Sequence, residues 1–424
     1  MGKINEIIFK LGVAFRNNLL FNSFDFLKKS QYWDNKKTEE YQVKKFNELI
    51  QFAINNSSYL NEKYKNIDVR IKSIKDLDKI PAITKKELLE HNSDIQITQG
   101  VGKLIFSETS GSTGEPLIFY RTKEWDARHR AAQLRGYSWH GVKPWEKNGY
   151  FWGYDFSGKS IRKIKLLDFL LNRFRIFSYK KEEIIDFSLK LKKAKYLEGY
   201  SSMIYEVAKT LNSLNIKVTN LKMVKGTSEK IYDSYQEEVK KAFGKKMISE
   251  YGAAETGIIA FECKNGNMHI TSENVIVEEE KGEVIVTNLL SKSFPIIRYK
   301  LGDSVKINYE KKCSCGVSHP IIDDVQGRVG KSISGFKNKY PSLTFYYIFK
   351  NLALNSDLTL NYQAIQNKRG HLIFYIDREL KDFEKDLVIK EAFKYFNTDI
   401  EVKISSKLLK RDYSKKFKDF ISTI

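Results

Sequence analysis

A short run of hydroxyl side chains and glycines lies between two β-branched and aromatic segments, at Thr109-Ser110-Gly111-Ser112-Thr113-Gly114. Gly111 and Gly114 permit backbone conformations that are closed to other residues, so successive N–H groups can face one anion, and the hydroxyls add donors. The run is not a Walker loop, because no lysine follows its last glycine and a strand pattern continues at Leu117. The pattern predicts a phosphate-binding turn between two strands, with a flexible turn that holds no ligand as the alternative.

All three cysteines of the chain lie after residue 262, together with a histidine at a spacing that suits a metal site. Cys263 and His269 form a C-x5-H pair around one polar turn, and Cys313 and Cys315 form a C-x-C knuckle on another. Three thiolates and one imidazole make a closed tetrahedral set, the kind that binds zinc structurally. The alternative is a group of unrelated buried thiols, and His319 is a spare candidate ligand.

The middle of the chain alternates between helical and strand patterns. The segments are helix, strand, helix and strand, at residues 204–214, 221–224, 231–243 and 246–249. Such alternation predicts an α/β fold with a parallel sheet, in which ligands bind beyond the carboxyl ends of the strands. Residues 226–229 and 251–255 fall at such ends, so we expect both segments to border a ligand site.

Other segments complete the expected architecture. Helices are predicted at 36–66, 83–92 and 124–139, with Thr84 as the cap of the second. After residue 270 the chain changes to short strands separated by polar turns, which predicts a β-rich subdomain. Residues 329–424 carry strands near 359–365, 371–376 and 400–405 and a helix near 384–396. The sequence therefore predicts two domains, residues 1–328 and a small α+β domain of residues 329–424.

The charge balance of the chain is strongly basic but diffuse. The 424 residues contain 73 Lys and Arg against 52 Asp and Glu, so the formal charge is 73 − 52 = +21, spread through every segment. This excess favours any polyanion, from nucleotides to lipid head groups, and no nucleic-acid-binding motif is visible, so nucleic acid is not expected as a partner. No segment has the apolar length of a membrane-spanning helix and no cleavage site follows the N-terminus, so a cytoplasmic protein is expected.

An amphipathic pattern that ends in lysines runs through residues 4–29. Such a pattern could hold the protein peripherally at the inner face of a membrane with anionic lipids. Packing of its apolar stripe into a core is the simpler interpretation, and it is the one that the pattern favours.

Four motifs, in order along the chain, resemble the core motifs of the adenylate-forming superfamily of acyl-CoA synthetases. They are the hydroxyl-rich run, Tyr251-Gly252-Ala253-Ala254-Glu255, Arg298-Tyr299-Lys300-Leu301-Gly302-Asp303, and Gly327-Arg328. The chain looks most like the phenylacetate-CoA ligase branch, with its CapK-like relatives from capsular polysaccharide biosynthesis, because of residues 46–50 and 55–60 and a zinc knuckle like that of the branch. The resemblance covers most of the chain. It implies a large adenylating N-terminal domain, residues 1–328, and a small mobile cap, residues 329–424.

The resemblance implies an ATP-dependent, AMP-forming acid–thiol ligase, which uses Mg²⁺ and passes the acyl group from an acyl-adenylate to a thiol, with coenzyme A as the first choice. The ATP-binding residues that it implies are Ser110, Gly111, Ser112, Thr113, Gly114, Gly226, Thr227, Ser228, Glu229, Tyr251, Gly252, Asp303 and Arg328. Thr109 and Glu255 become catalytic residues, with Glu255 as the magnesium ligand and Asp303 as acceptor for both ribose hydroxyls. A surface ion pair is the alternative for Glu255, and a turn residue is the alternative for Asp303.

Lys416 is implied as the catalytic lysine, because residues 410–418 resemble the mobile lysine motif of the superfamily. The glycine that usually precedes this lysine is Lys415 here, so either lysine could serve. The alternative is a basic tail that faces solvent.

The acyl pocket is implied to contain Trp152, Tyr154 and the segment Glu198-Gly199-Tyr200-Ser201-Ser202, with Tyr200 and Ser201 as the substrate residues, and no residue in it fixes the acid. Aromatic side chains also fill ordinary cores, which is the alternative for each of them. Two other functions remain open: the adenylate could pass to an amine of a sugar or amino acid in surface-polysaccharide assembly, or the chain could be a catalytically retired nucleotide-binding scaffold. The sequence does not indicate an oligomeric state.

Overall fold

The computed structural model describes residues 2–109, 117–151, 158–176, 181–228, 231, 233–280, 282–328, 332–356, 358, 360, 362–376, 378–406 and 420–424. The chain divides into two compact units. The first unit comprises Met1–Thr109, Leu117–Leu301 and Val305–Val325, and the second comprises Ser110–Pro116, Gly302–Ser304 and Gln326–Ile424. The mobility of a C-terminal cap that begins at residue 329 stays a prediction.

Helices form the N-terminal part of the first unit. They are α1 (Gly2–Asn17), α2 (Leu19–Ser30), α3 (Asn35–Asn56), α4 (Ser58–Tyr64), the 3-10 helix η1 (Ile74–Lys79), α5 (Lys85–Glu90) and α6 (Asn92–Ile95). Ser57 divides the helix predicted over 36–66 into two, because its hydroxyl caps α4 by accepting from the Leu60 N–H at 3.3 Å. The predicted cap at Thr84 is confirmed: its hydroxyl accepts from the Glu87 N–H, and the Glu87 carboxylate accepts from the Thr84 N–H.

The apolar stripe of α1 faces outward, so the core packing that the sequence favoured for residues 4–29 is wrong for this helix, whereas it is confirmed for Leu20 and Leu27 of α2. Four of its side chains are more than half exposed: Ile4, Ile7, Leu11 and Phe15. The other side of the helix makes the contacts with the rest of the unit, and the Phe9 ring lies 5.8 Å from the Trp145 ring. The helix is therefore packed through one face while its most apolar face is left to solvent.

A hairpin and a long helix follow. Strands β1 (Leu104–Glu108) and β2 (Ile118–Thr122) pair antiparallel, as the patterns on both sides of the hydroxyl-rich run predict. Helix α7 (Lys123–Trp139) begins directly after β2, where the Thr122 hydroxyl accepts from the Trp125 N–H at 3.2 Å. Trp125 stacks on Phe119 of β2, with ring centroids 5.4 Å apart, so the hairpin and the helix share one core.

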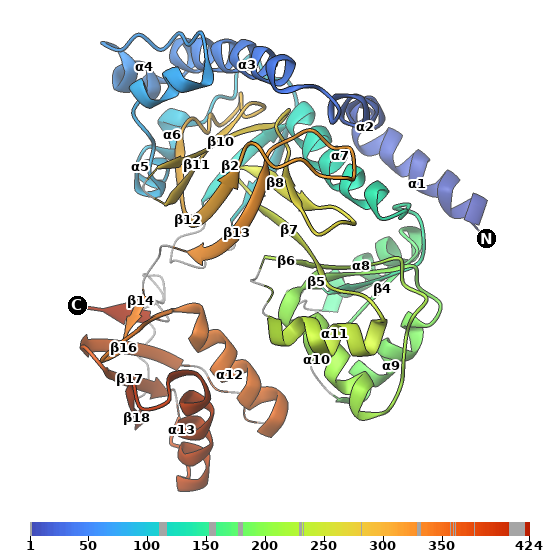
Figure 1. Ribbon diagram of the computed structural model, residues 1–424, viewed down its shortest axis with the longest axis vertical. Helices are drawn as coiled ribbons and strands as arrows, with labels where there is room; N and C mark the ends of the chain where they lie inside the picture. The colour runs from blue at the N-terminus through green and yellow to red at the C-terminus, as the bar shows by residue number, and fades with distance from the viewer. Residues whose placement is uncertain are drawn as a thin grey trace. The chain divides into compact units, whose positions relative to one another are not determined.

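Within the described residues, eleven strands form one sheet in the order β10-β11-β12-β13-β9-β8-β7-β6-β5-β3-β4 (Figure 1). Their bounds are β3 (Asn148–Phe151), β4 (Arg173–Arg175), β5 (Tyr196–Tyr200), β6 (Met223–Thr227), β7 (Ile248–Ala253), β8 (Gly257–Glu262), β9 (Met268–Ile270), β10 (Val275–Glu280), β11 (Glu283–Asn288), β12 (Tyr299–Asn308) and β13 (Ile321–Arg328). Strands β4, β3, β5, β6 and β7 are parallel, whereas β7–β8 and β8–β9 pair antiparallel. The predicted α/β class is confirmed.

Helices cover both faces of the parallel part of the sheet. They include α8 (Gly158–Leu170), α9 (Lys181–Leu191), α10 (Ser201–Ser213) and α11 (Asp233–Phe243), and Figure 1 shows α9, α10 and α11 together on one side of β5 and β6. On the other face, Tyr196, Met223 and Ile248 pack against Tyr137 of α7. Because strand side chains alternate between faces, every second residue of β5, β6 and β7 points toward α7.

The second unit is a small α+β unit. It contains β14 (Ser332–Ser334), β15 (Lys339–Pro341), α12 (Leu343–Ser356), β16 (Tyr362–Lys368), β17 (His371–Ile376), α13 (Asp382–Phe396), β18 (Glu401–Ser406) and β19 (Phe420–Ser422). Four described strands form a sheet in the order β18-β17-β16-β19, and Phe345, Phe374 and Phe396 pack in the core between the sheet and the helices. The strands and the helix that the sequence predicts in this region are confirmed.

Candidate functional site

The carboxyl ends of β5, β6 and β7 meet at one edge of the sheet and bring together residues that lie far apart in the sequence. Tyr200 pairs with Thr227 across β5 and β6, and Thr227 pairs with Glu250 of β7. Tyr251 and Gly252 lie at the end of β7, and a register shift between them bends that strand. The described residues of the two segments that the sequence placed at strand ends, 226–228 and 251–255, therefore border one edge, where α/β proteins bind ligands.

Two glycines at this edge are required by close packing. A Cβ on Gly226 would lie 2.5 Å from the Ser201 hydroxyl oxygen, and a Cβ on Gly252 would lie 2.2 Å from the carbonyl oxygen of Gly257. A larger residue at Gly252 would require the backbone to shift, and one at Gly226 would require the side chains of Ser201 and Met247 to move. The glycines therefore let the backbone of β6 and β7 approach their neighbours closely at the edge.

Glu255 lies in the turn between β7 and β8, and only 5% of the residue is exposed. The hydroxyl of Tyr299 donates to its Oε1 at 3.2 Å, and the side-chain amide of Asn288 donates to its carbonyl oxygen at 3.2 Å. These contacts come from the end of β11 and the start of β12, so two further strands hold the turn in place. A fixed, buried carboxylate is the ligand type that Mg²⁺ takes in proteins.

Thr109 closes the hairpin that carries the hydroxyl-rich run. Its N–H donates to the Leu117 carbonyl oxygen at 3.0 Å, and its side-chain oxygen accepts from the Leu117 N–H at 2.8 Å. The two chain ends of the run are thus fastened together at its base. The run itself, including Ser110, Gly111, Ser112, Thr113 and Gly114, lies outside the described residues.

The four predicted metal ligands come together, although they belong to two loops about fifty residues apart. The ligand atoms of Cys263, His269, Cys313 and Cys315 all lie within 4.8 Å of one another. The sulfurs of Cys263 and Cys313 are 3.7 Å apart, and the Cys315 sulfur is 3.2 Å from Nε2 of His269. Two thiolates on a tetrahedral zinc ion, with Zn–S bonds of about 2.3 Å, lie about 3.8 Å apart. The donor set and its spacing fit zinc.

Contacts around His269 favour the form that binds a metal, whereas burial of Cys315 opposes the thiolate. Nδ1 of His269 lies 3.2 Å from the carbonyl oxygen of His319, and because a carbonyl only accepts, Nδ1 carries the proton and Nε2 keeps a lone pair facing Cys315. Burial lowers the pKa of His269 to about 4, so the ring is neutral at neutral pH. Burial also raises the pKa of the Cys315 thiol to about 12, so a bound cation is needed to hold it as a thiolate.

His319, the spare candidate ligand, has a different role. Its Nδ1 lies 2.9 Å from the Ile270 carbonyl oxygen, and its Nε2 lies 3.5 Å from a carboxylate oxygen of Glu273. The same Glu273 oxygen accepts from Ser30 of α2 at 2.5 Å and from Arg135 of α7 at 2.7 Å. His319 therefore ties the cysteine loop to two helices, and it does not join the metal-ligand group.

No family model matches the chain. Protein CapK of Staphylococcus aureus is 25% identical over 380 residues, which cover 83% of this chain and 81% of CapK. Among solved structures, 2-hydroxyisobutyryl-CoA ligase in the postadenylation state, in complex with R3-HIB-AMP, is similar with a TM-score of 0.64, 14% identity, and coverage of 93% of this chain and 91% of the ligase. The open conformation of that ligase, in complex with 2-HIB-AMP and CoA, has a TM-score of 0.59, 14% identity and coverage of 92% of both chains. This chain is CapK-like and has the fold of the adenylate-forming ligases. The resemblance that the four motifs indicated is confirmed at that level.

The structure places some of the site residues predicted for this CapK-like chain and not others. Tyr200, Ser201, Gly226, Thr227, Ser228, Tyr251, Gly252 and Glu255 lie at or beside the strand-end edge of the first unit. Asp303 lies within β12, directly after Gly302, whose φ is +81°. Arg328 is the last residue of β13. Trp152, Tyr154, Glu229, Lys415 and Lys416 lie outside the described residues.

A buried charge cluster directly beneath the edge was not predicted. Nζ of Lys225 lies 3.2 Å from a carboxylate oxygen of Glu198 and 2.9 Å from one of Glu250, and only 1% of the lysine is exposed. From α7, the Tyr137 hydroxyl donates to Glu198 and the Gln133 amide donates to Glu250. We call these five residues the Lys225 cluster. Burial lowers the pKa of Lys225, but the two carboxylates outweigh it and hold that pKa above its ordinary value.

The strand period explains where the Lys225 cluster lies. Each charged member stands two residues before a predicted site residue, in the pairs Glu198 and Tyr200, Lys225 and Thr227, and Glu250 and Gly252. Residues two apart on a strand share a face, so the cluster and the edge belong to one continuous surface of the sheet toward α7. The signal in the sequence was one charged residue inside each of three otherwise uncharged strands.

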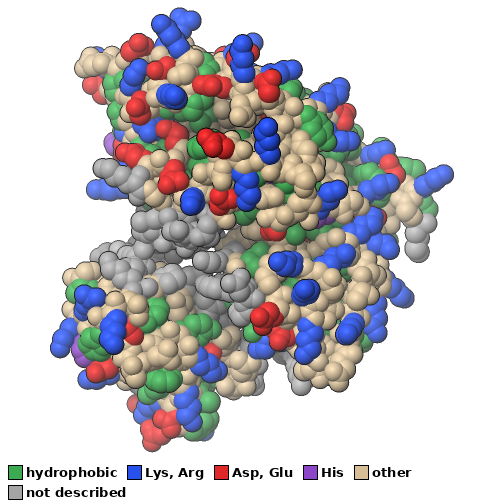
Figure 2. Space-filling view, viewed as in Figure 1, with side chains coloured by type: hydrophobic (Ala, Val, Ile, Leu, Met, Phe, Trp, Pro, Cys, Tyr) green, Lys and Arg blue, Asp and Glu red, His purple; other side chains and the backbone are tan. Residues whose placement is uncertain are grey.

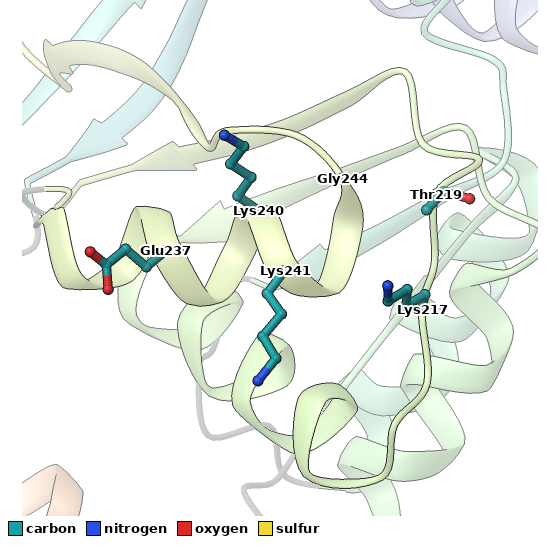
Figure 3. A pocket seen from close by; sticks show the side chains of 6 residues that line it. All are labelled: Lys217, Thr219, Glu237, Lys240, Lys241 and Gly244. Atoms are coloured by element: carbon teal, nitrogen blue, oxygen red, sulfur yellow. The ribbon is translucent and has the colours of Figure 1, made fainter.

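A separate depression lies on the first unit and is lined by Lys217, Thr219, Glu237, Lys240, Lys241 and Gly244 (Figure 3). Figure 3 shows the side chains of Lys240 and Lys241 pointing in different directions from α11. Lys217 and Thr219 precede β6, so the depression lies toward the amino end of that strand, away from the strand-end edge. Its lysines do not converge on one point, so it is not the candidate site.

Proposed function

We propose that this CapK-like protein activates a carboxylic acid with ATP as an acyl-adenylate and then transfers the acyl group to a thiol, with coenzyme A as the acceptor to test first. The observation that carries the proposal is the likeness, over nine-tenths of the chain, to a ligase whose structures hold an acyl-AMP and CoA. The strand-end edge and Thr109, at the base of the hairpin, support the proposal because they contain residues of types that suit this chemistry.

In the first step, a carboxylate oxygen of the acid attacks the α-phosphorus of ATP, and the bond from that phosphorus to the bridging oxygen of pyrophosphate breaks. The difficulty is negative charge, so the protein contributes position and electrostatic stabilisation. N–H and hydroxyl groups of residues 109–114 would bind the β- and γ-phosphates, and Glu255 would hold a Mg²⁺ ion. When bound, that ion neutralises charge on the phosphate oxygens. The ammonium of Lys416 or Lys415 is the group that we propose to stabilise the leaving oxygen.

The nucleoside is held by residues from several strands. Tyr251 lies next to adenine together with Gly226, Thr227, Ser228, Glu229 and Gly252, while Asp303 accepts from the ribose hydroxyls and Arg328 meets ribose or phosphate. Trp152, Tyr154, Tyr200 and Ser201 border the acyl group. In the second step, a thiol sulfur attacks the acyl carbon, the bond from that carbon to the AMP oxygen breaks, and AMP leaves. We propose that residues 329–424 act as a cap that rotates between the two steps.

The Cys/His set is proposed to hold a structural zinc ion. Four protein ligands leave no position open for water, so the ion supplies no step of the reaction. It would join the turn between β8 and β9 to the loop before β13.

The experiment that tests the proposal follows what becomes of the phosphates of ATP and of the acyl group. Purified protein is incubated with ATP, Mg²⁺ and a panel of carboxylic acids, with and without coenzyme A, and products are identified by mass spectrometry. The proposal predicts acid-dependent AMP and pyrophosphate, with an acyl-CoA when coenzyme A is present. An acyl-adenylate that is consumed only by an added amino sugar or amino acid would move the acceptor to an amine. ATP binding with no pyrophosphate release from any acid would indicate the retired scaffold and contradict the proposal.

A further inference from the structure

Helix α1 presents an apolar face to solvent. Ile4, Ile7, Leu11 and Phe15 are 62%, 57%, 65% and 97% exposed, and they follow one another at spacings of three and four residues. That spacing places all four on one side of the helix. Large apolar side chains scattered singly over a surface need no explanation, but a continuous helical stripe marks a contact with something else.

Helix α8 extends this apolar surface. It contacts α1, and Leu166, Leu167, Phe169 and Leu170 near its end are 59%, 44%, 78% and 39% exposed. Two helices that contact each other thus both expose apolar side chains. We call these eight side chains the α1/α8 face.

Basic residues surround the α1/α8 face, and acidic ones near it are already neutralised. Among the side chains that the structure describes in the two helices, six are cationic and exposed: Lys3, Lys10, Arg16, Arg162, Lys163 and Lys165. The described acidic side chains of α1 and α8 are Glu6, which pairs with Lys10 at 2.7 Å, and Asp168, which is buried and pairs with Arg173 and Arg175 at 2.5 Å. In Figure 2, Lys and Arg side chains stand among apolar ones at the N-terminal end of the chain. The face is therefore apolar at its centre and positive around it.

We propose that the α1/α8 face docks on the surface of a membrane that contains anionic lipids. Exposed apolar side chains enter the boundary between head groups and acyl chains, while the surrounding ammonium and guanidinium groups meet lipid phosphates. A second copy of the chain fits the face less well, because two such faces would bring their basic residues together. None of the described helices is long and apolar enough to cross a membrane, so the docking is peripheral. The proposal stands independently of the proposed reaction.

The test uses the full chain and vesicles of phosphatidylcholine, with or without phosphatidylglycerol, in a flotation assay. The protein is expected to float with the anionic vesicles and to bind them less as salt rises, because its basic residues are screened. Leu11→Glu and Phe15→Glu are each expected to weaken binding at least about tenfold, since they place a charge in the apolar centre. Phe383→Glu is the matched control, because Phe383 is 61% exposed but lies on α13 of the second unit.

Melting temperatures verify that the variants are folded, which is expected because the substituted side chains are exposed. Failure of the wild-type chain to float with anionic vesicles would overturn the proposal. So would equal flotation of Leu11→Glu, Phe15→Glu and Phe383→Glu. A wild-type dimer in solution that both α1 variants convert to monomer would assign the face to a second copy and also overturn it.

Discussion

Glu198, Lys225 and Glu250 lie on three neighbouring strands, directly beneath the edge where the nucleotide and acid are proposed to bind. A buried ammonium between two carboxylates depends on both partners, because removal of one member leaves an uncompensated charge in the interior. Tyr200, Thr227 and Gly252 follow these charged residues on the same face of the sheet. The proposed site therefore lies directly beside a buried group of charges.

Lys225→Met is expected to destabilise the first unit by about 3–5 kcal/mol, because two buried carboxylates lose their common counter-charge. Urea unfolding followed by tryptophan fluorescence measures this change. Lys222→Met is the matched control: Lys222 pairs with Glu146 at 2.6 Å, but 37% of its side chain is exposed. Its loss is expected to cost less than about 1 kcal/mol. Equal losses in the free energy of unfolding of both variants would show that the buried ion pairs of Lys225 contribute no more to stability than an exposed pair.

Two residues, Lys415 and Lys416, are candidates for the catalytic lysine. Lys416→Ala is expected to lower the rate of acyl-adenylate formation by a factor of about 100 or more, because a cation near the leaving oxygen is lost. Lys415→Ala is the matched control, one position away in the same basic segment, and it is expected to retain most of the rate. Single-turnover measurement of AMP release compares them, and the reverse ranking would assign the role to Lys415.

Among single residues, the sequence predicted those whose chemistry depends on type and spacing. The C-x5-H pair and the C-x-C knuckle are of this kind, and the structure brings them together. The Lys225 cluster could not be predicted in the same way, because the sequence does not say which strands are neighbours or which helix covers them. Whether a lone charged residue in a strand is paired depends on those long-range contacts.

At the scale of elements, the start of α5 is stabilised by a network around Glu87. Burial by itself raises the pKa of Glu87, but hydrogen bonds from Lys63, Thr84 and Tyr59 outweigh it and lower that pKa to about 2. The folded pKa is thus below the ordinary value of 4.5. The carboxylate therefore stabilises the fold fully above the unfolded pKa, and this stabilisation is lost as the pH falls through the folded one.

Glu87→Gln is accordingly expected to lower the melting temperature at pH 7, by an amount that corresponds to about 1 kcal/mol, the usual value of a helix cap. The difference in melting temperature between the variant and the wild type is expected to shrink as the pH falls from the unfolded pKa of Glu87 toward its folded pKa. Near the folded pKa the difference is expected to vanish. Glu90→Gln is the control on the same helix, because its exposed pair with Lys86 is long, at 3.7 Å. A difference of constant size from neutral to acidic pH would contradict the assignment.

The metal site connects two loops that are also linked by hydrogen bonds from Asn265 and Asn267 to the C-x-C knuckle. We expect the purified protein to contain about one zinc ion per chain, and Cys313→Ser to lose it and to melt at a lower temperature, because four ligands from two loops share one ion. Ser314→Ala is the matched control, since Ser314 lies in the same knuckle and only accepts from Asn265 at the surface. Elemental analysis and thermal melts measure both effects. Metal-free protein that melts no lower than the zinc-loaded protein would remove the structural role.

Helices and strands were predicted well where local signals agree with the packing. Thr84 caps α5, and the parallel strands follow the alternation in the middle of the chain. The prediction for α1 was wrong, because an amphipathic stripe gives the direction of an apolar face and not what covers it. The helix predicted over 36–66 was too long, because the cap at Ser57 was not recognised within an otherwise helical pattern.

At the scale of the whole molecule, the sequence predicted the class of the fold but not that one sheet continues through β3 to β13. It indicated a β-rich subdomain after residue 270, whereas β8 to β13 continue the sheet that β3 to β7 begin. That continuation depends on the antiparallel pairing of β7 with β8 through the bulge at Tyr251 and Gly252, which is a long-range consequence of a local irregularity. The turn at Glu255 lies at this junction, so the change from parallel to antiparallel strands positions the proposed magnesium ligand.

Acid-dependent exchange of labelled pyrophosphate into ATP tests the central claim most directly, because it requires reversible formation of the acyl-adenylate. The account predicts exchange with at least one carboxylic acid and a loss of about 100-fold or more in Glu255→Gln, which keeps the shape of the side chain and removes its charge. Glu283→Gln, at the start of β11, is the control and is expected to exchange at the wild-type rate. Exchange that is unchanged in Glu255→Gln, or no exchange with any acid, would contradict the account.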